Sequence, residues 1–350
     1  MPLRLRLVEN PPNPYLSQHA EWLEPPPLSR MEIYEETSGS VLSRNDSPDL
    51  PFTWSVNPYR GCQHACAYCY ARPYHEYLGM GAGTDFETKL IVKTNAADLL
   101  AREFRKKSWK RECVNFSGIT DCYQPIEASY GITRACLEVC LDFSNPVTVV
   151  TKGFLVVRDA DLLARLNSVA GATVCISIPF ADEEIARLIE PLAPPPERRF
   201  EAVRRLSKAG VPVYVFVAPI IPGLNDRDIP KILEQAASAG ARHASYTVLR
   251  LPGSVENVFV SRLREAMPLR AERVLARIRD IRGGALNESR FGKRMRGGGT
   301  YWESIRNLFA ISLERYGFDK SDESSSVMAR PAPHDGRPRE HVQLGFDFQH

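Results

Sequence analysis

The sequence has no long apolar run and almost no net charge. Although 43% of its 350 residues are hydrophobic, no stretch approaches the roughly 20 consecutive apolar residues of a membrane-spanning helix. The chain reaches Glu9 and several prolines at once, so we expect no secretory signal. A formal net charge of +3 does not by itself indicate a nucleic-acid partner. These absences favour a cytoplasmic protein whose eight cysteines are reduced thiols.

The texture of the sequence changes near residue 51. Residues 1–50 are rich in proline and predict an extended arm or linker. Short apolar segments then alternate with helical patterns. The expected strands are 54–57, 114–117, 147–151, 173–178, 213–217 and 245–249, and the expected helices are 131–141, 159–167, 182–188, 196–209 and 230–239. Strands separated by helices of this length pair in parallel through right-handed crossovers, which predicts an α/β fold.

Three cysteines stand at C-x3-C-x2-C spacing, namely Cys62, Cys66 and Cys69. A four-iron four-sulfur cluster normally has four thiolate ligands, so a three-cysteine loop predicts one iron open to an exogenous ligand. Zinc sites prefer two paired knuckles. No second knuckle follows here, because Cys136 and Cys140 lie in a helical pattern. The spacing favours the cluster, with zinc as the alternative.

With Tyr68 just before the third cysteine, this motif resembles that of the radical S-adenosylmethionine (SAM) superfamily. The resemblance implies that the three cysteines bind a 4Fe-4S cluster whose fourth iron is chelated by SAM. It implies an external electron donor, cleavage of SAM to a 5′-deoxyadenosyl radical, and hydrogen abstraction from a substrate. The implied fold is a partial, open, six-stranded parallel β/α barrel. We expect it to span residues 51–260, between an N-terminal arm over 1–50 and a basic C-terminal helical extension over 261–318.

Polar and apolar residues at the predicted strand ends supply candidate SAM contacts, because β/α barrels gather their reactive groups there. The segment from Ser117 to Asp121 occupies the place of the superfamily's Gly-Gly-Glu motif, so Thr120 and Asp121 are candidates for the SAM amino group. Lys152 is a candidate for the SAM carboxylate and Ser177 for the ribose. The predicted cofactor-binding residues are Tyr68, Ser117, Gly118, Thr120, Asp121, Lys152, Ser177, Ile220 and Leu249. The alternative for the strand-end candidates is an ordinary capping, strand-end or core role.

A radical enzyme also needs a group that can return a hydrogen atom to a product radical. Cys122 and Tyr123 follow the second strand of the predicted barrel and are the catalytic candidates. Cys175 and Tyr130 lie in or near similar segments. The alternative is packing, since a buried cysteine is also simply a small core residue.

A narrower resemblance, to the spore photoproduct lyase-related branch of the superfamily, covers roughly residues 50–255. It rests on the segments 57–62, 70–73, 120–127, 151–153 and 218–226. That branch is named for an enzyme that reverses a thymine dimer in DNA. The chain is more similar to uncharacterised relatives that share Tyr-Ala-Arg-Pro at 70–73 and Gly-x-Asp-Phe-Glu at 83–87, so only the radical-generating half is implied. A peptide or small-molecule substrate, or a non-catalytic iron–sulfur interaction module, remains an alternative.

Two segments outside the barrel suggest partners. From Arg262 to Arg296 the chain holds eleven Lys or Arg and four acids, with Gly297 to Gly299, Tyr301 and Trp302 close by. Such a block can bind the phosphates and bases of nucleic acid. The alternative is a solvated helix over 269–281.

The segment 319–350 is polar and predicted to be a disordered tail. It ends in a short peptide, from Gln343 to Phe348, that resembles the sequence with which bacterial replication and repair proteins dock on the sliding clamp. Phe346 stands where leucine is usual in that peptide. The alternative is a tail that packs on its own domain.

Overall fold

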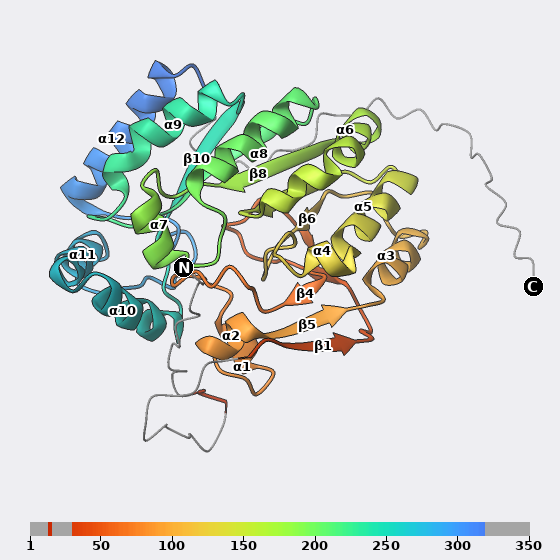
Figure 1. Ribbon diagram of the computed structural model, residues 1–350, viewed down its shortest axis with the longest axis horizontal. Coiled ribbons are helices and arrows are strands. Elements are labelled where there is room, and N and C mark those ends of the chain that lie inside the picture. Colours follow the sequence, from red (N-terminus) through yellow and green to blue (C-terminus); the bar gives the residue numbers. More distant parts are fainter. Residues whose placement is uncertain (1–12, 16–29, 319–350) are drawn as a thin grey trace, which may run out of the picture.

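The computed structural model describes residues 13–15 and 30–318 and forms an α/β fold around one large parallel sheet (Figure 1). The strands of this sheet that run parallel to their neighbours are β3 (Trp54–Val56), β6 (Val114–Phe116), β7 (Val147–Thr151), β8 (Ala172–Ser177), β9 (Val213–Ile220) and β10 (His243–Val248). The strand order is β10-β9-β8-β7-β6-β3-β2, with β2 (Leu42–Arg44) antiparallel to β3. The strand β10 does not pair back to β3, so the six parallel strands form an open barrel, as predicted.

Helices follow the strands and cover the outside of the sheet. Figure 1 shows α5, α6, α8 and α9 arranged one after another around it. The helices on this side are α3 (Ala96–Phe104), α4 (Glu127–Tyr130), α5 (Ile132–Asp142), α6 (Ala160–Val169), α8 (Pro196–Lys208) and α9 (Ile229–Ser238), with short 3-10 turns at Phe154–Asp159 and Asp226–Asp228. The helix α7 (Glu183–Ile189) packs instead in one core cluster with the cysteine loop. The local sequence sets these boundaries, since proline opens α8 and Asp182 caps α7 by accepting from the backbone of Glu184 and Ile185.

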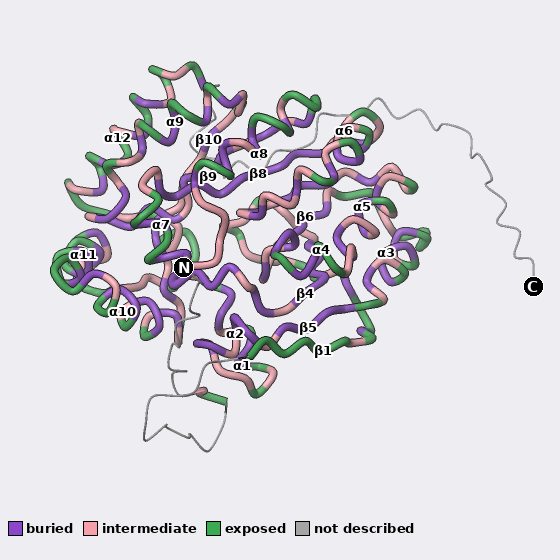
Figure 2. The backbone as a smooth tube through the Cα atoms, in the orientation of Figure 1, coloured by how far each residue is buried: buried purple, intermediate pink, exposed green. Residues whose placement is uncertain are grey.

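The strands are apolar because they are covered on both faces. Every residue of β8 is buried, and β7 is buried except at Val150. Figure 2 shows this buried centre, in purple, beneath the more exposed helices. Valine dominates β7, and β8 contains no charged residue, as expected for a parallel sheet with two covered faces. The strands predicted from the sequence are confirmed to within a few residues.

Part of the segment predicted to be an N-terminal arm or linker forms two strands. The strand β1 (Glu32–Glu36) pairs in parallel with β5 (Lys89–Lys93), and β4 (Tyr59–Arg60) pairs antiparallel with β5. This second sheet lies beside the barrel, and β2 extends the barrel sheet itself. The strand β1 is almost entirely exposed, so it lacks the alternating apolar pattern by which strands are recognised (Figure 2).

The C-terminal part of the described chain is helical, as expected, but it is not a separate appendage. It consists of α10 (Val255–Ala266), α11 (Pro268–Ile281) and α12 (Gly299–Arg315). The first two bury Phe259 and Leu275 in one core cluster with Cys66 and Tyr68 of the cysteine loop. The last helix buries Trp302 in the main core. The extension therefore covers the cysteine loop and one end of the barrel.

Within residues 13–15 and 30–318, no helix is both long and apolar enough to cross a membrane. The predicted tail and its terminal peptide lie outside the described residues.

Candidate iron–sulfur and cofactor site

The cysteine loop begins with a backbone turn that only glycine accommodates easily. Gly61 has φ +76°, and a Cβ there would lie 2.9 Å from the carbonyl oxygen of Phe86. The amide of the next residue, Cys62, donates to that same oxygen at 2.9 Å. Ala65, within the loop, also has a positive φ of 56°. The loop is therefore held in a conformation that an unsupported chain would not favour.

The three thiols of the motif lie on one short loop that is largely buried. Cys62 and Cys66 are buried, Cys69 is partly exposed, and all three are free. Burial raises the pKa of each thiol, to about 12 for Cys66, and the other two thiols raise the pKa of Cys62 further. Thiols of this kind become thiolates only beside a cation such as a metal centre. Three thiols on one short loop, two of which act electrostatically on Cys62, fit the donor set of a cluster that keeps one iron open.

Two buried arginines donate hydrogen bonds to the backbone of the cysteine loop. Arg72 donates through Nε and Nη2 to the carbonyl oxygen of Cys66 at 3.1 and 2.8 Å, and Arg262 donates to the carbonyl oxygen of Ala65. Both guanidinium groups also bind the Glu87 carboxylate, Arg72 at 2.5 Å. We call Arg72, Glu87 and Arg262 the arginine triad. It gives a structural reason for the Tyr-Ala-Arg-Pro and Gly-x-Asp-Phe-Glu segments, which supply two of its members.

The segment after β6 clamps the loop from another side. The Thr120 hydroxyl donates to the carbonyl oxygen of Gly61 at 2.6 Å, and Gln124 Nε2 donates to the same oxygen at 3.1 Å. Gln124 Oε1 accepts from the amide of Gln63 at 2.9 Å. The structure thus places Thr120 on the cysteine loop and gives its hydroxyl a supporting bond there. Its contact with the SAM amino group stays a prediction.

Asp121, in the loop after β6, links the cysteine loop to the carboxyl end of β7. Its carboxylate accepts from Thr151 Oγ1 at 2.6 Å and the amide of Lys152 at 2.7 Å, and lies 3.2 Å from His64 Nδ1. Burial alone would raise the pKa of Asp121, but its interaction with His64 and these hydrogen bonds lower it to about 2. A fixed anion here is suited to the SAM ammonium group. It also ties the loop to β7.

A second charged group lies beside the middle cysteine. The Tyr68 hydroxyl donates to the buried Glu190, which binds Arg199 at 2.5 Å and lies 3.9 Å from Lys152 Nζ. Lys152 Nζ is also 5.6 Å from the centre of the Tyr68 ring. Arg199 donates in addition to the carbonyl oxygen of Ser177 at 3.0 Å. Two cations share one carboxylate, so the group carries a surplus positive charge that suits the SAM carboxylate.

Sequence reasoning missed Arg199, Arg262 and Glu190 as parts of the site. A signal was present for the arginines, because each stands on the apolar stripe of its helix. Arg199 is buried in line with Val203 and Leu206 of α8, and Arg262 with Phe259 and Leu263 of α10. A charged residue on such a stripe requires a buried partner. The sequence does not say which carboxylate that partner is.

The other predicted cofactor residues lie at strand ends, as expected. Ser117 has φ +84°, and its hydroxyl accepts from the amide of Cys122 at 3.0 Å. The amide of Gly118 donates to Asn57 Oδ1 at 2.8 Å. These bonds fix the loop after β6 against the start of the cysteine loop.

The two predicted adenine contacts lie next to each other. The amide of Leu249 donates to the carbonyl oxygen of Ile220 at 2.9 Å, and both side chains are fully buried. The structure thus brings the ends of β9 and β10 together at one apolar position. Contact of these side chains with adenine stays a prediction.

The predicted hydrogen-atom donors are buried and tightly engaged. Cys122 and Tyr123 pack in the main core, and the Tyr123 hydroxyl donates to Asp159 at 3.0 Å. Burial raises the pKa of both groups. Cys175 is buried within β8, and the Tyr130 hydroxyl donates to Glu35 at 2.8 Å. These contacts give the four residues packing or tethering roles, and hydrogen-atom donation stays a prediction.

The basic stretch predicted to bind nucleic acid is partly built into the fold. Arg262 is buried in the arginine triad, and Arg282 donates to the carbonyl oxygens of Leu249 at 2.7 Å and Arg294 at 3.0 Å. Arg294 binds Asp49 at 2.5 Å. Other members pair with carboxylates at the surface, including Arg264, Arg277 and Arg290. The stretch therefore presents fewer uncommitted charges than its composition suggests.

Comparison with known proteins identifies the family. A protein-family model described as the Radical SAM superfamily matches residues 56–236 of the chain. The chain belongs to the radical SAM superfamily. The 4Fe-4S cluster and SAM that this membership implies are its cofactors. That the three thiols hold the cluster, and that the predicted strand-end residues hold SAM, stays a prediction.

This radical SAM protein has relatives without an assigned activity. An uncharacterised protein of Mycobacterium tuberculosis is 37% identical over 246 residues, covering 69% of this chain and 72% of the relative. An uncharacterised protein of Methanocaldococcus jannaschii is 31% identical over 198 residues, covering 57% and 71%. Among solved structures, spore photoproduct lyase complexed with a dinucleoside spore photoproduct superimposes with a TM-score of 0.57 at 15% identity, over 81% of this chain and 79% of that one. That likeness shows a shared fold.

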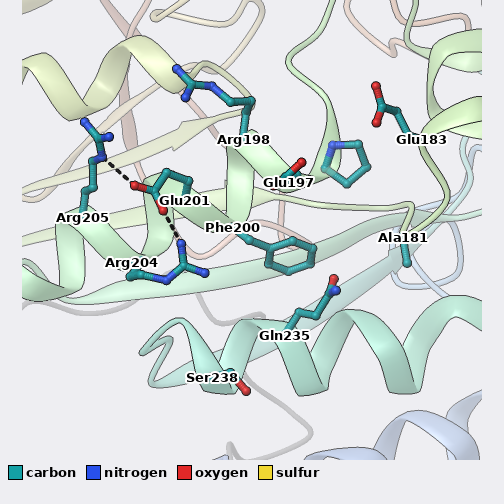
Figure 3. A pocket seen from close by; sticks show the side chains of 11 residues that line it. Ala181, Glu183, Glu197, Arg198, Phe200, Glu201, Arg204, Arg205, Gln235 and Ser238 are labelled. Atoms are coloured by element: carbon teal, nitrogen blue, oxygen red, sulfur yellow. Dashed lines mark hydrogen bonds and ion pairs between the residues drawn. The ribbon is translucent and has the colours of Figure 1, made fainter.

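A groove of about 740 Å³ lies elsewhere on this radical SAM protein, on the outside of the barrel (Figure 3). Its lining includes Phe200, Glu201 and Arg204 of α8 and Gln235 of α9. None of the cluster cysteines and none of the predicted SAM residues line it. Figure 3 shows Glu201 bound to Arg204 and to Arg205. The lining also includes Arg198, Glu183 and Glu197, so the charges of the groove balance as a set.

Proposed function

We propose that this radical SAM enzyme takes a hydrogen atom from a nucleic acid, in DNA repair or in base modification. When bound, the cofactors supply reductive cleavage of SAM to methionine and a 5′-deoxyadenosyl radical. The chain's own residues hold the reacting groups in place: Asp121 meets the SAM ammonium group, Lys152 meets its carboxylate, and Ile220 and Leu249 exclude water around the adenine.

The observation that carries the nucleic-acid proposal is the uncompensated charge of Arg250 at the carboxyl end of β10. Its Nε is buried without a hydrogen bond, and within the described residues the one hydrogen bond of its guanidinium goes to the sulfur of Met295, at 3.6 Å. Asp49 acts on it, but that carboxylate is bound to Arg294. Burial, and then the Arg294 charge, lower the pKa of Arg250. A cation left without a carboxylate in this way is suited to an anionic ligand such as a phosphate.

Exposed tyrosines beside Arg250 support the same proposal. Tyr70 follows the last cluster cysteine and is 47% exposed, and Arg250 acts electrostatically on it. Tyr74 and Tyr77 continue from it on the surface, with ring centres 6.3 Å apart. Exposed aromatic rings next to a cation are suited to stacking bases while the phosphate is bound. We therefore infer that the substrate reaches the cluster along this row of tyrosines.

The radical reaction is tested first. The purified protein is reconstituted anaerobically with iron and sulfide, then given SAM and dithionite, beside a variant with Cys62, Cys66 and Cys69 all changed to alanine. We expect 5′-deoxyadenosine from the native protein and none from the variant. A fully loaded protein that binds SAM but does not cleave it, with or without DNA, would favour a non-catalytic iron–sulfur interaction module.

The substrate class is tested by binding a fluorescent single-stranded oligonucleotide to the reconstituted protein at several salt concentrations. We expect Arg250→Gln to weaken binding about tenfold and to reduce the salt dependence by about one charge, and Tyr74→Ala to weaken binding at every salt concentration. Arg270→Gln, at an exposed position of the basic stretch, is the matched control and should bind almost normally. Equal losses at positions 250 and 270 would move the interface to the basic stretch, and absence of salt-dependent binding would favour a peptide or small molecule.

A second assay follows the hydrogen atom. Oligonucleotides deuterated in their bases or sugars should transfer deuterium into 5′-deoxyadenosine if they are substrates.

Docking of the terminal peptide on a sliding clamp and a cytoplasmic location stay predictions, and both agree with a nucleic-acid substrate.

A further inference from the structure

The arginine triad contacts the backbone of the cysteine loop and carries a surplus positive charge that SAM binding does not explain. Arg72, Glu87 and Arg262 are all buried, and the two guanidinium groups share one carboxylate oxygen. No other carboxylate is paired with either arginine in the parts of the chain that the structure describes. The group therefore sums to one net positive charge in a region of low dielectric, where charges act strongly.

A buried Arg–Glu–Arg group is not needed for stability alone. Replacing such groups by apolar side chains often leaves a protein equally stable or more stable, because removing charges from water is costly. The triad touches the loop directly, since Arg72 donates twice to the carbonyl oxygen of Cys66 and Arg262 to that of Ala65. Its placement next to two loop peptides indicates an electrostatic task at the loop.

Reduction of a cluster adds one electron, and hence one negative charge, to this buried loop. The net charge, hydrogen bonding and burial around an iron–sulfur centre set its reduction potential. A fixed positive charge beneath the loop favours the electron-rich state. We propose that the arginine triad raises the reduction potential of the cluster and so eases its one-electron reduction by a low-potential donor. Arg72 and Arg262 are then positioning residues that act through the cluster loop.

The test is a redox titration of the reconstituted protein with dithionite and mediators, followed by electron paramagnetic resonance of the reduced cluster. Arg262→Met removes one positive charge and should lower the ratio of reduced to oxidised cluster about tenfold at a fixed potential. For a one-electron couple this corresponds to a shift of about 59 mV to lower potential. Glu87→Gln removes the negative charge and should shift the potential in the opposite direction.

Arg264→Met is the matched control. It removes the same charge from the same helix, but Arg264 is exposed and paired with the exposed Glu272 at 2.8 Å. Solvent and salt screen such a charge, so we expect no measurable shift. Arg262→Lys keeps the charge and should restore most of the native potential. Iron content and the thermal unfolding midpoint, measured on each variant, check that the cluster is fully loaded in a folded chain.

Opposite shifts for Arg262→Met and Glu87→Gln support the proposal, because a merely mechanical role would not reverse sign with the charge removed. Shifts in the same direction, or none in fully loaded protein, would overturn it. If Glu87→Gln fails to hold a cluster, the comparison of Met with Lys at position 262 decides, and equal potentials for these two refute the proposal. The titration needs neither SAM nor a substrate, so its outcome is independent of the nucleic-acid proposal.

Discussion

The chain buries two groups of cysteines, and their surroundings differ although their burial is similar. Cys62 and Cys66 lie in the loop, whereas Cys136 and Cys140 pack in the main core on α5. Burial is the main cause of a raised pKa in both groups. The difference is the cations nearby.

Cations lower the pKa of two of the three loop cysteines, Cys66 and Cys69, and do not act on the core pair. Lys152 acts to lower the pKa of Cys66, and Arg72 that of Cys69, even though burial prevails. Around Cys136 and Cys140 only other thiols and Glu127 act, and they raise the pKa further. Burial thus makes a thiol inert, and fixed cations together with a held backbone prepare it to become a ligand.

The largest difference should come from replacing one cysteine of each group by alanine and comparing the two variants. Cys66→Ala should abolish cluster binding and 5′-deoxyadenosine formation, because no other thiol can take its place in the loop. Cys140→Ala should leave the iron content unchanged and lower the free energy of unfolding by about 1–2 kcal/mol. Iron analysis and denaturant unfolding measure the two quantities. A loss of cluster from Cys140→Ala would show that the comparison between the groups is wrong.

An intermediate effect is expected from replacing Arg199, the buried cation that is bound to Glu190. Arg199→Met leaves Glu190 buried with Lys152 at 3.9 Å as its remaining cation. Breaking a buried pair in this way should lower the free energy of unfolding by about 3–5 kcal/mol and impair cluster loading. Arg204→Met, which breaks an exposed pair with Glu201 on the same helix, should change it by less than about 1 kcal/mol. Similar losses in both variants would contradict the distinction between buried and exposed pairs.

The smallest effect concerns pH. Folding lowers the pKa of Asp121 from 3.8 to about 2. The ionised carboxylate therefore stabilises the fold fully at pH values above the pKa of the unfolded chain, and this stabilisation is lost as the pH falls toward 2. A shift of this size corresponds to about 2 kcal/mol. Asp121→Asn should therefore lose stability at pH 7 and show a flatter decline than the native apoprotein between about pH 4 and pH 2. Chemical unfolding at several pH values measures this, and parallel declines in the two proteins would argue against a special Asp121 environment.

Much of the barrel followed from the sequence because its signals are local. Proline at the start of α8, glycine after α8 and α9, and valine-rich segments such as 147–151 need only neighbouring residues for their interpretation. The strand β1 was not predicted because it depends on pairing with β5, more than fifty residues away. Its exposed pattern, Glu-Ile-Tyr-Glu-Glu, gives no periodic signal.

The same division applies to the candidate site. Spacing alone identified Cys62, Cys66 and Cys69, since ligands of one cluster that lie in one short loop are close in sequence. The arginine triad could not be assembled in this way, because Arg72 and Arg262 are 190 residues apart in the numbering and meet only when α10 folds over the loop.

The sequence by itself determined the radical SAM motif, the six parallel strands and the positions of the main helices between them, because these depend on local spacing and periodicity. Only the tertiary structure decided which charges serve the site. It turned Arg262 from a member of a basic stretch into a buried partner of Glu87, and it left Arg250 without a carboxylate. The physical reason is that the state of a charge depends on its burial and its partners in space, and neither is written in the order of residues.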